Sequence, residues 1–396
     1  MVKIETSITM AEEENMKWYM VFHKKRTLML LFIPISLFIL WLVQSNEQIA
    51  EYVFARGLYK WISQGLSLLM GIFPFSIMEV EILALPILTM IIAIRFIWKL
   101  MHRVHKKQGA VAYELSKVIL NVACTLSTLM FLFVILAGVN YYRYSFTSYS
   151  KLYIRNSSVN ELYNLCLELA DEAADIRGQL RIQGGTEDEN GVLQLSKTSW
   201  RDVSKTAEGS FEKLSEEYPV LGGHYGVPKP VLFSRFMSRM EITGIFWPFT
   251  MEANVNVDAT EYSIPAAMGH ELAHLRGFMR EDEANFIAYL VCKQSDSLDF
   301  QYSGIMLALT YAGNELYRQD TGLYQQVRES YNVGMLADLR EEYYYWKQFE
   351  DTVISTVSNS VNDTYLKVNN QDDGVKSYGR MVDLLLAEYR KNHSIE

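Results

Sequence analysis

The chain has 396 residues, of which 49% are hydrophobic and 13% aromatic, and its formal net charge is −9. This length is sufficient for about two or three structural units with at least one sizeable core. The mild acidity excludes a general nucleic-acid binder, which is expected to carry a basic face.

Three apolar stretches near the start of the chain are long enough to cross a bilayer, which takes about 20 residues. Residues 27–46 and 118–142 contain no charged side chain. Between them, the apolar run 82–94 reaches a spanning length when it is extended to Met78 and Trp98. We therefore predict a mainly α protein whose residues 27–142 form a membrane domain with three transmembrane helices, so that the lipid bilayer is its first partner.

Basic residues around these stretches predict the orientation of the protein in the cell membrane. Three precede the first span and six lie between the second and third spans, namely Lys24, Lys25, Arg26, Arg95, Lys99, Arg103, Lys106, Lys107 and Lys117. The connection between the first two spans has only Arg56 and Lys60, offset by Glu47 and Glu51. Because Lys and Arg favour the cytoplasmic side, residues 1–26 are expected to be a cytoplasmic segment and residues 143–396 an extracytoplasmic domain.

The connection between the first two spans is amphipathic rather than spanning. Within residues 49–71, apolar side chains recur at Ile49, Tyr52, Val53, Leu58, Trp61 and Ile62. Such a segment either lies on the outer membrane surface or packs as an ordinary helix against the spans, and the pattern favours neither.

The extracytoplasmic domain is predicted to be α+β and mostly helical. Ser158 and Glu161 have the spacing of a capping box that opens a helix towards Ile182. Apolar periodicity predicts further helices at 200–217, 281–293, 302–317, 335–357 and 378–390. The three cysteines do not make a disulfide framework, and a single Cys166–Cys292 bridge stays open because nothing in the spacing predicts it.

Short strands are expected directly before the metal motif described below. Residues 231–233 and 240–257 are rich in β-branched and aromatic residues, interrupted by Gly244 and Pro248. Asn254 and Asn256 alternate with valines, as in a half-buried strand. This strand either pairs with an extended peptide substrate by β-addition or is simply an edge strand of the core.

Residues His270-Glu271-Leu272-Ala273-His274 match the pattern H-E-x-x-H. Pro265 suits the first turn of a helix and Gly277 its end, so the motif lies in the middle of a helix. Residues four apart share one face, so His270 and His274 can bind the same Zn²⁺. Glu271 then projects beside the ion, where it serves as general base towards a zinc-activated water.

A catalytic zinc ion needs a third protein ligand and an open position for water. Arg280 stands where the pattern H-E-x-x-H-x-x-G-x-x-H has its third histidine, so that version is excluded. Glu281 begins the next predicted helix, which can fold back against the first, and we favour it as ligand, with Asp282 and Glu283 as alternatives. Asn285 shares a face with Glu281 and is expected to hydrogen-bond a ligating histidine or the Glu281 carboxylate.

Several short segments of the sequence resemble the family catalogued as domain of unknown function 3810. These are Phe246-Trp247-Pro248-Phe249-Thr250, Gly269–His274 and Glu281–Phe286 behind three spans, with Phe73–Ser76 before the second span and Asn140–Arg143 after the third. The resemblance implies a bacterial multipass membrane protein regarded as a zinc metallopeptidase. Glu281-x-x-Ala284-Asn285 is also similar to the third-ligand motif of gluzincin-type peptidases, whose first Glu binds zinc, although the linker after His274 is shorter here than in most gluzincins.

Together these features predict a membrane-anchored zinc metallopeptidase with a zincin-like domain, acting on a peptide or protein substrate. The carbonyl oxygen of that substrate needs one more donor as its charge grows, and the candidates are Tyr262, His224, Tyr302 and Tyr378. The alternatives are a structural zinc site, which usually has four ligands including Cys, and a membrane-tethered sensor whose motif holds no catalytic metal. Substrate preference and oligomeric state are not indicated by the sequence.

Overall fold

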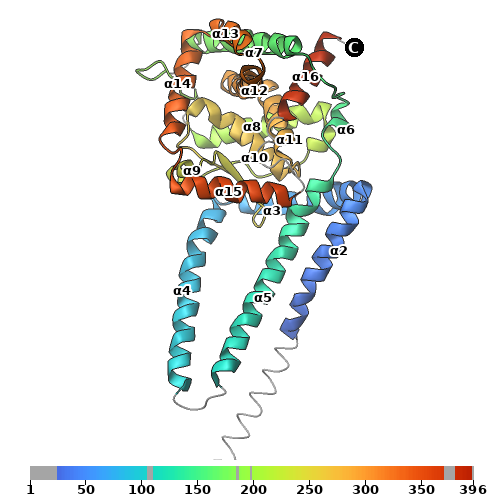
Figure 1. Ribbon diagram of the computed structural model, residues 1–396, viewed down its shortest axis with the longest axis vertical. Helices are drawn as coiled ribbons and strands as arrows, with labels where there is room; N and C mark the ends of the chain where they lie inside the picture. Colours follow the sequence, from blue (N-terminus) through green and yellow to red (C-terminus); the bar gives the residue numbers. More distant parts are fainter. Residues whose placement is uncertain (1–24, 105–109, 184–186, 197–198, 370–379, 395–396) are drawn as a thin grey trace, which may run out of the picture. The chain divides into compact units, whose positions relative to one another are not determined.

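The computed structural model describes residues 25–104, 110–183, 187–196, 199–369 and 380–394 (Figure 1). The chain is mainly helical with one small sheet, and it divides into two compact units. Unit 1 comprises Met1–Asn46 and Ile82–Val139, and unit 2 comprises Glu47–Glu81 and Asn140–Glu396. The connection between the first two spans therefore clusters with the C-terminal part of the chain, although the sequence interpretation grouped it with the spans.

Three helices are long and apolar enough to cross a membrane, as the sequence predicts: Lys25–Ser45, Ile77–Trp98 and Lys117–Leu136. They comprise η1 (Leu28–Leu31) with α2 (Phe32–Ser45), most of α4 (Ile77–Val104), and α5 (Ala110–Leu136). Within unit 1, the rings of Phe32 and Phe131 stack at 4.7 Å, and the Ser127 hydroxyl donates to the Met29 carbonyl at 2.7 Å. The third helix ends six residues before Tyr142, the predicted end of the span, and the 3₁₀ turn η3 (Gly138–Tyr142) follows.

The connection forms the π-helix η2 (Ile49–Tyr59) and helix α3 (Lys60–Met70). One face of η2 is buried in unit 2 through Ala50, Glu51, Phe54, Ala55 and Tyr59. The same segment exposes large apolar side chains, namely Tyr52, Val53, Leu58 and Trp61. The segment is therefore packed on protein along one side and apolar towards the surroundings along the other.

Four helices of unit 2 pack each against the next in the order α7, α12, α11, α10. α7 (Val159–Ile182) packs against α12 (Leu298–Gln319), α12 against α11 (Glu281–Lys293), and α11 against α10 (Ile264–Leu275). The predicted capping box is confirmed at the start of α7, where the Ser158 hydroxyl accepts from the Glu161 backbone and the Glu161 carboxylate accepts from the Ser158 backbone. Other short elements and helices of unit 2 are α6 (Thr147–Ser150), α8 (Trp200–Glu217), η4 (Pro219–Leu221), η5 (Glu261–Ser263), α13 (Thr321–Glu329) and α16 (Arg380–His393).

The sheet has the order β1-β3-β2, with β1 (Lys229–Pro230) parallel and β2 (Gly244–Trp247) antiparallel to β3 (Glu252–Val255). The expected strand at 231–233 is wrong, because these residues lead into helix α9 (Ser234–Arg239). The expected strand around Asn254 forms as β3, but it is not half-buried, since every residue of β3 is buried. β3 is the central strand, with β1 beside its Asn254 and Val255 on one side and β2 along its whole length on the other, so β1 and β2 are the edge strands.

Buried charges attach this sheet to the start of α4 and to the connection before it. The Glu252 carboxylate accepts the backbone N–H groups of Ile77 and Met78, both at 3.0 Å, and pairs with the ammonium of Lys229. The Lys229 ammonium also donates to the carbonyls of Met70 and Phe75. Each of these buried groups has a partner, so burying the ion pair leaves no charge uncompensated.

The predicted helix 335–357 is two helices, α14 (Val333–Lys347) and α15 (Val353–Val368). The break follows from Asp351, whose φ is 55°, and from Thr352, which caps α15 through a reciprocal pair of bonds with Ser355. α16 begins at Arg380, and the predicted start at Tyr378 lies outside the described residues. All three cysteines are free and buried, so the open Cys166–Cys292 bridge does not form.

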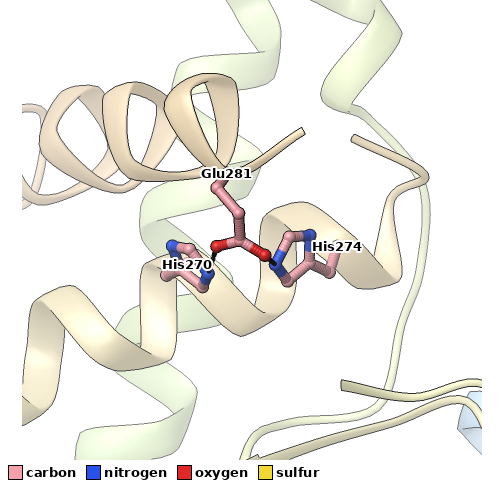
Figure 2. Close-up of side chains that lie close together, drawn as sticks. All are labelled: His270, His274 and Glu281. Atoms are coloured by element: carbon pink, nitrogen blue, oxygen red, sulfur yellow. Dashed lines mark ion pairs between the residues drawn. The ribbon is translucent and has the colours of Figure 1, made fainter. Parts of the chain in front are cut away.

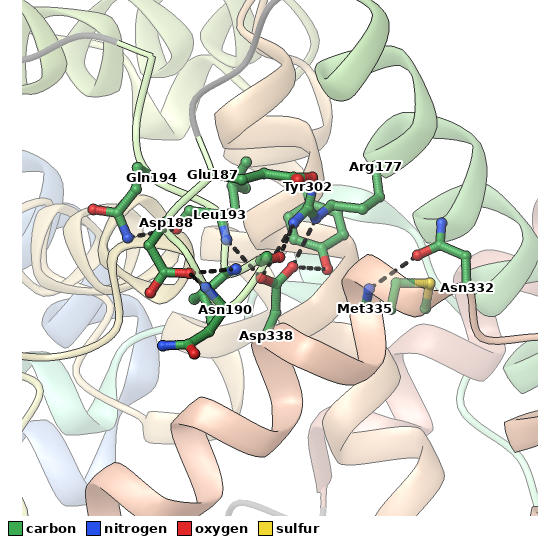
Figure 3. A network of polar contacts seen from close by, with 12 residues as sticks. Arg177, Glu187, Asp188, Asn190, Leu193, Gln194, Tyr302, Asn332, Met335 and Asp338 are labelled. Atoms are coloured by element: carbon green, nitrogen blue, oxygen red, sulfur yellow. Dashed lines mark hydrogen bonds and ion pairs between the residues drawn. The ribbon is translucent and has the colours of Figure 1, made fainter.

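A buried polar network ties α7, α12 and α14 together (Figure 3). The Asp338 carboxylate accepts from the Arg177 guanidinium at 2.8 Å, from the Tyr302 hydroxyl at 2.7 Å and from the Leu193 backbone at 2.7 Å. Arg177 also pairs with Glu187 at 2.7 Å. Because Tyr302 is committed to this network, it is a structural residue rather than a donor for a substrate.

Candidate metal centre

The helix that carries the motif is delimited by local sequence. Pro265 stands in the first turn of α10, where its missing N–H costs no hydrogen bond. At the other end, the Phe278 N–H donates to the Ala273 carbonyl and the Gly277 N–H to the His274 carbonyl. These two bonds make a Schellman motif, and they require the left-handed backbone that Gly277 adopts with φ 86°. The chain therefore turns back directly after His274.

Close packing of α10 and α11 brings the start of α11 over the histidines. A Cβ atom on Gly269 would lie 3.1 Å from Cα and 3.2 Å from Cβ of Ala288, so the two helices approach more closely than larger residues allow. Glu281 is the first residue of α11, only seven positions after His274. The short linker and the small residues together place its carboxylate opposite the motif.

His270, His274 and Glu281 converge, with one potential ligand atom of each lying within 4.8 Å of the others (Figure 2). Nε2 of His270 is 3.2 Å from Oε2 of Glu281, and Nε2 of His274 is 3.6 Å from Oε1. The two imidazole planes are nearly perpendicular, at 88°. Two imidazole nitrogens and one carboxylate form a ligand set of the His₂Glu type found in zinc hydrolases, so the donor chemistry fits that ion.

The second nitrogen of each imidazole is held by a protein oxygen. Nδ1 of His274 lies 2.8 Å from the carbonyl of Phe278, which can only accept, so this nitrogen carries the proton. Nδ1 of His270 lies 2.9 Å from Oδ1 of Asn285, whose amide nitrogen donates to the hydroxyl of Tyr311. The neutral form of each ring then has its lone pair on Nε2, which faces Glu281 and is free to bind a metal. Asn285 thus contacts a histidine as the sequence predicts.

The other two acidic candidates point elsewhere. The Glu283 carboxylate accepts the backbone N–H of Phe146 at 2.8 Å and pairs with Arg280 at 2.9 Å. Asp282 pairs with Arg380 at 3.2 Å. Among the three neighbouring carboxylates, Glu281 is therefore the one that the structure brings to the histidines.

Charge at the site favours a cation between these groups. Burial lowers the pKa of His270, but the hydrogen bond and charge of Glu281 outweigh it and raise that pKa to about 9. Burial raises the pKa of Glu281, but His274 and His270 outweigh it and hold the pKa well below its usual range. A positive charge beside Glu281 is thus stabilised whether a proton or a metal ion supplies it.

Glu271 lies beside His270 and His274, and one of its carboxylate oxygens has no hydrogen-bond partner among the described residues. This oxygen, Oε2, is buried, while the backbone N–H of Phe246 donates to the carboxylate. Burial raises the pKa of Glu271. A Cβ atom on Gly244 would lie 2.5 Å from Oε1 and 2.7 Å from Cγ of Glu271, so only glycine allows β2 to pass this close. An orphaned buried oxygen next to three converging ligands is where a polar group, such as water, can be accommodated.

The family is decided by a comparison over most of the chain. Residues 54–386 match the family described as "Protein of unknown function (DUF3810)". The chain belongs to the DUF3810 family. No curated protein and no solved structure matches it. The family resemblance seen in the sequence is thus confirmed, and the function of this DUF3810 protein must be argued from the site itself.

Residues to which the sequence assigned no role at the site hold the C-terminal end of α10 in this DUF3810 protein. The Tyr59 hydroxyl lies 3.1 Å from the carbonyls of both His274 and Leu275. The Arg143 guanidinium donates to the Arg276 carbonyl at 3.2 Å and pairs with Glu51 through two bonds. The sequence interpretation counted Glu51 only as a charge for topology, and no local pattern links it with Arg143, which is 92 positions away.

The predicted donors for a substrate carbonyl are distributed as follows. Tyr262 is buried and hydrogen-bonded to Glu342, and Tyr302 belongs to the network of Asp338. His224 is exposed, and its backbone N–H donates to Gln64. Tyr378 lies outside the described residues. The structure instead places Tyr311 near the site, where it contacts Asn285 and where burial, followed by the charge of Glu281, raises its pKa.

Proposed function

We propose that this protein is a membrane-anchored zinc peptidase whose metal ligands are His270, His274 and Glu281. The observation that carries the proposal is the convergence of these three side chains beside the unpaired buried oxygen of Glu271. When bound, zinc supplies a Lewis acid and lowers the pKa of a coordinated water towards neutrality.

The proposed role of Glu271 is that of general base and acid. Its Oε2 accepts a proton from the attacking water and later delivers that proton to the leaving amine. Burial raises the pKa of this carboxyl towards the working range of such a base, and the N–H of Phe246 keeps the other end of the carboxylate in place. A Cβ atom at Gly244 would lie 2.5 Å from Oε1 and 2.7 Å from Cγ, so β2 leaves no room for a side chain between its backbone and Glu271.

Strand β2 is the proposed docking edge for a peptide. It pairs with β3 along one side, and among the described residues it has no strand on the other side. Gly244 and Phe246, which contact Glu271, belong to this strand, so a peptide added to it would run past the carboxylate. This assignment replaces the sequence hypothesis of β-addition at Asn254, because β3 is the central strand.

The proposed location of the site is outside the cytoplasm. Lys24–Arg26 and the basic connection between α4 and α5 favour the cytoplasmic side, and three crossings then place unit 2 on the opposite side. Substrates are accordingly sought among peptides and proteins outside the cytoplasm.

The test uses the full chain purified in detergent and reconstituted into vesicles. The protein is expected to contain one zinc ion per chain and to cleave members of a mixed library of fluorescence-quenched peptides. Glu271→Gln is expected to keep the zinc and lose the cleavage, because the amide cannot accept the proton, whereas His274→Ala is expected to lose both. Zinc-loaded protein whose peptide cleavage is unchanged by Glu271→Gln would refute the peptidase.

A second candidate function is a membrane-tethered sensor that binds a metal without turnover. The same experiment separates it from the peptidase. A sensor would bind zinc through the three ligands, would cleave no peptide, and would be indifferent to Glu271→Gln.

A further inference from the structure

Some of the exposed apolar side chains of unit 2 belong to segments attached to the points where the chain leaves unit 2 for a span. After the first span, Tyr52, Val53 and Trp61 are 58%, 57% and 78% exposed. At the start of the second, the Glu79 carboxylate accepts the backbone N–H of Leu232 at 3.0 Å, and the Leu232 side chain is 79% exposed. Two of the three crossings are thus bordered by apolar groups that a soluble surface normally avoids.

Helix α15 provides the apolar group at the third crossing. The Tyr365 hydroxyl lies 3.0 Å from that of Tyr141, which comes two residues after unit 1 ends at Val139. The exposed aliphatic residues of α15, with their exposed fractions, are Val353 (81%), Ile354 (40%), Val357 (57%), Val361 (64%) and Val368 (75%). Their spacing of about four places them on one face of the helix. Ser355 and Leu366, on the opposite face, are buried in unit 2.

The few charges of α15 also indicate what kind of surface this helix can contact. Its 16 residues include two charged side chains, Asp363 and Lys367, and these pair with each other at 2.6 Å. The helix therefore offers no net charge to a partner, and burial of its valine face is the interaction that remains. A surface of this kind suits the lipid interface by apolar area and has no need of anionic headgroups.

Apolar exposure in unit 2 is uneven. Helices α8, α10, α11, α13 and α16 expose no large hydrophobic side chain among their described residues, whereas α7, α12 and α14 expose Ile182, Tyr317, Val333, Leu336, Tyr343 and Tyr344. The apolar groups described above differ from these because they are attached to Tyr141, to Glu79 and to the segment after Asn46, which are the points of covalent continuity with the spans. This continuity identifies the bilayer, rather than another protein, as the partner.

We propose that α15 lies flat in the surface of the bilayer, with the face formed by Val353, Val357 and Val361 in contact with lipid. Tyr365 and Tyr141 attach the helix at the third crossing. This proposal does not depend on the activity of the metal site.

The test places an environment-sensitive fluorophore on single introduced cysteines in the full chain, reconstituted into phosphatidylcholine vesicles. The three native cysteines are buried and free, so they are replaced by alanine in the parent chain. Labels at Val357→Cys and Val361→Cys are expected to emit at shorter wavelength than in water and to be quenched by lipids that carry a nitroxide in the acyl chain. The matched control is Thr356→Cys, an exposed position off the apolar face.

The outcomes separate the bilayer from its rivals. The proposal requires acyl-chain quenching at the two valine positions, weak quenching at Thr356, and no further change when anionic lipid is added. Water-like emission at all three positions, with quenching by iodide, would overturn it. A blue shift could also be unaffected by acyl-chain quenchers and disappear when the protein is diluted in lipid. This result would overturn the proposal too, because a second copy of the chain would then cover the face. Cooperative thermal unfolding of each labelled protein, compared with that of the parent chain, shows that unit 2 has kept its fold.

Discussion

Gly244→Ala is the substitution that examines the placement of Glu271 most directly. An alanine Cβ would lie 2.5 Å from Oε1, 2.7 Å from Cγ and 2.8 Å from Cδ of Glu271, whereas ordinary contacts begin at 3.4 Å. The carboxylate must therefore move by about 0.9 Å. Rotation of the carboxylate alone does not relieve the clash, because Cγ is also too close. The side chain of Glu271 must shift as a whole, or strand β2 must withdraw.

The size of the effect follows from that displacement. A shift of about 1 Å in a catalytic group costs about 100-fold in rate, which corresponds to about 2.7 kcal/mol in the activation free energy. The three atoms nearest to the alanine Cβ all belong to Glu271 and none to a proposed metal ligand, so zinc content is expected to be unchanged. The predicted phenotype is a protein that holds its metal and cleaves peptide about 100-fold more slowly.

The assay measures zinc content and peptide cleavage in the same preparation. The control is Gly209→Ala, because a Cβ at this exposed position in α8 meets nothing within 4 Å and is expected to stabilise the helix by about 0.5–1 kcal/mol. Gly209→Ala should keep full activity. Full activity in Gly244→Ala would show that Glu271 is not positioned by β2, and loss of zinc in this variant would show that the strand supports the ligands instead.

Four further substitutions test the environment of the site. Glu281→Ala is expected to abolish tight zinc binding. Glu283→Ala should retain zinc but lose about 1–3 kcal/mol of folding free energy, because the backbone N–H of Phe146 is left without its acceptor. Calorimetric titration measures the zinc affinity and denaturant unfolding the folding free energy, and equal zinc affinities of the two variants would contradict the assignment of Glu281 as ligand. Asn285→Ala should weaken zinc affinity about 10- to 100-fold through loss of its bond to His270, and an unchanged dissociation constant would disprove this role. Tyr59→Phe should lower the unfolding free energy by about 1–3 kcal/mol because the buried carbonyl of Leu275 loses this donor, while that of His274 keeps the N–H of Gly277. A change below about 0.5 kcal/mol would argue that water replaces the hydroxyl.

Features encoded by local sequence were predictable. The spans follow from uncharged apolar runs, and helix 200–217 has the same bounds in the structure as in the prediction. Pro265 and Gly277 mark the ends of α10 because one lacks an N–H and the other tolerates a positive φ. The metal group follows likewise from the spacing of the histidines and from a carboxylate just after the turn.

Features that depend on distant contacts were not predictable. An amphipathic segment such as η2 can bury its apolar face against lipid or against protein equally well. The pair of Glu51 with Arg143, which ties η2 to the rest of unit 2, cannot be recognised in the sequence. Gly244 looked like an interruption of a strand, since only the fold reveals the carboxylate lying over it. The break before α15 was missed because Ser355 stands where a capping box normally has Glu or Gln.

Unit 2 is assembled from two stretches of chain that are synthesised far apart in time. The stretch Glu47–Glu81 supplies Tyr59 to the end of α10, Met78 to the packing around β2, and Glu51 as the only carboxylate that contacts Arg143 in the described residues. These groups have to wait until the second and third spans have been made before their partners emerge. Biogenesis is therefore ordered: the fold that brings His270, His274 and Glu281 together cannot close until the third apolar helix has been synthesised.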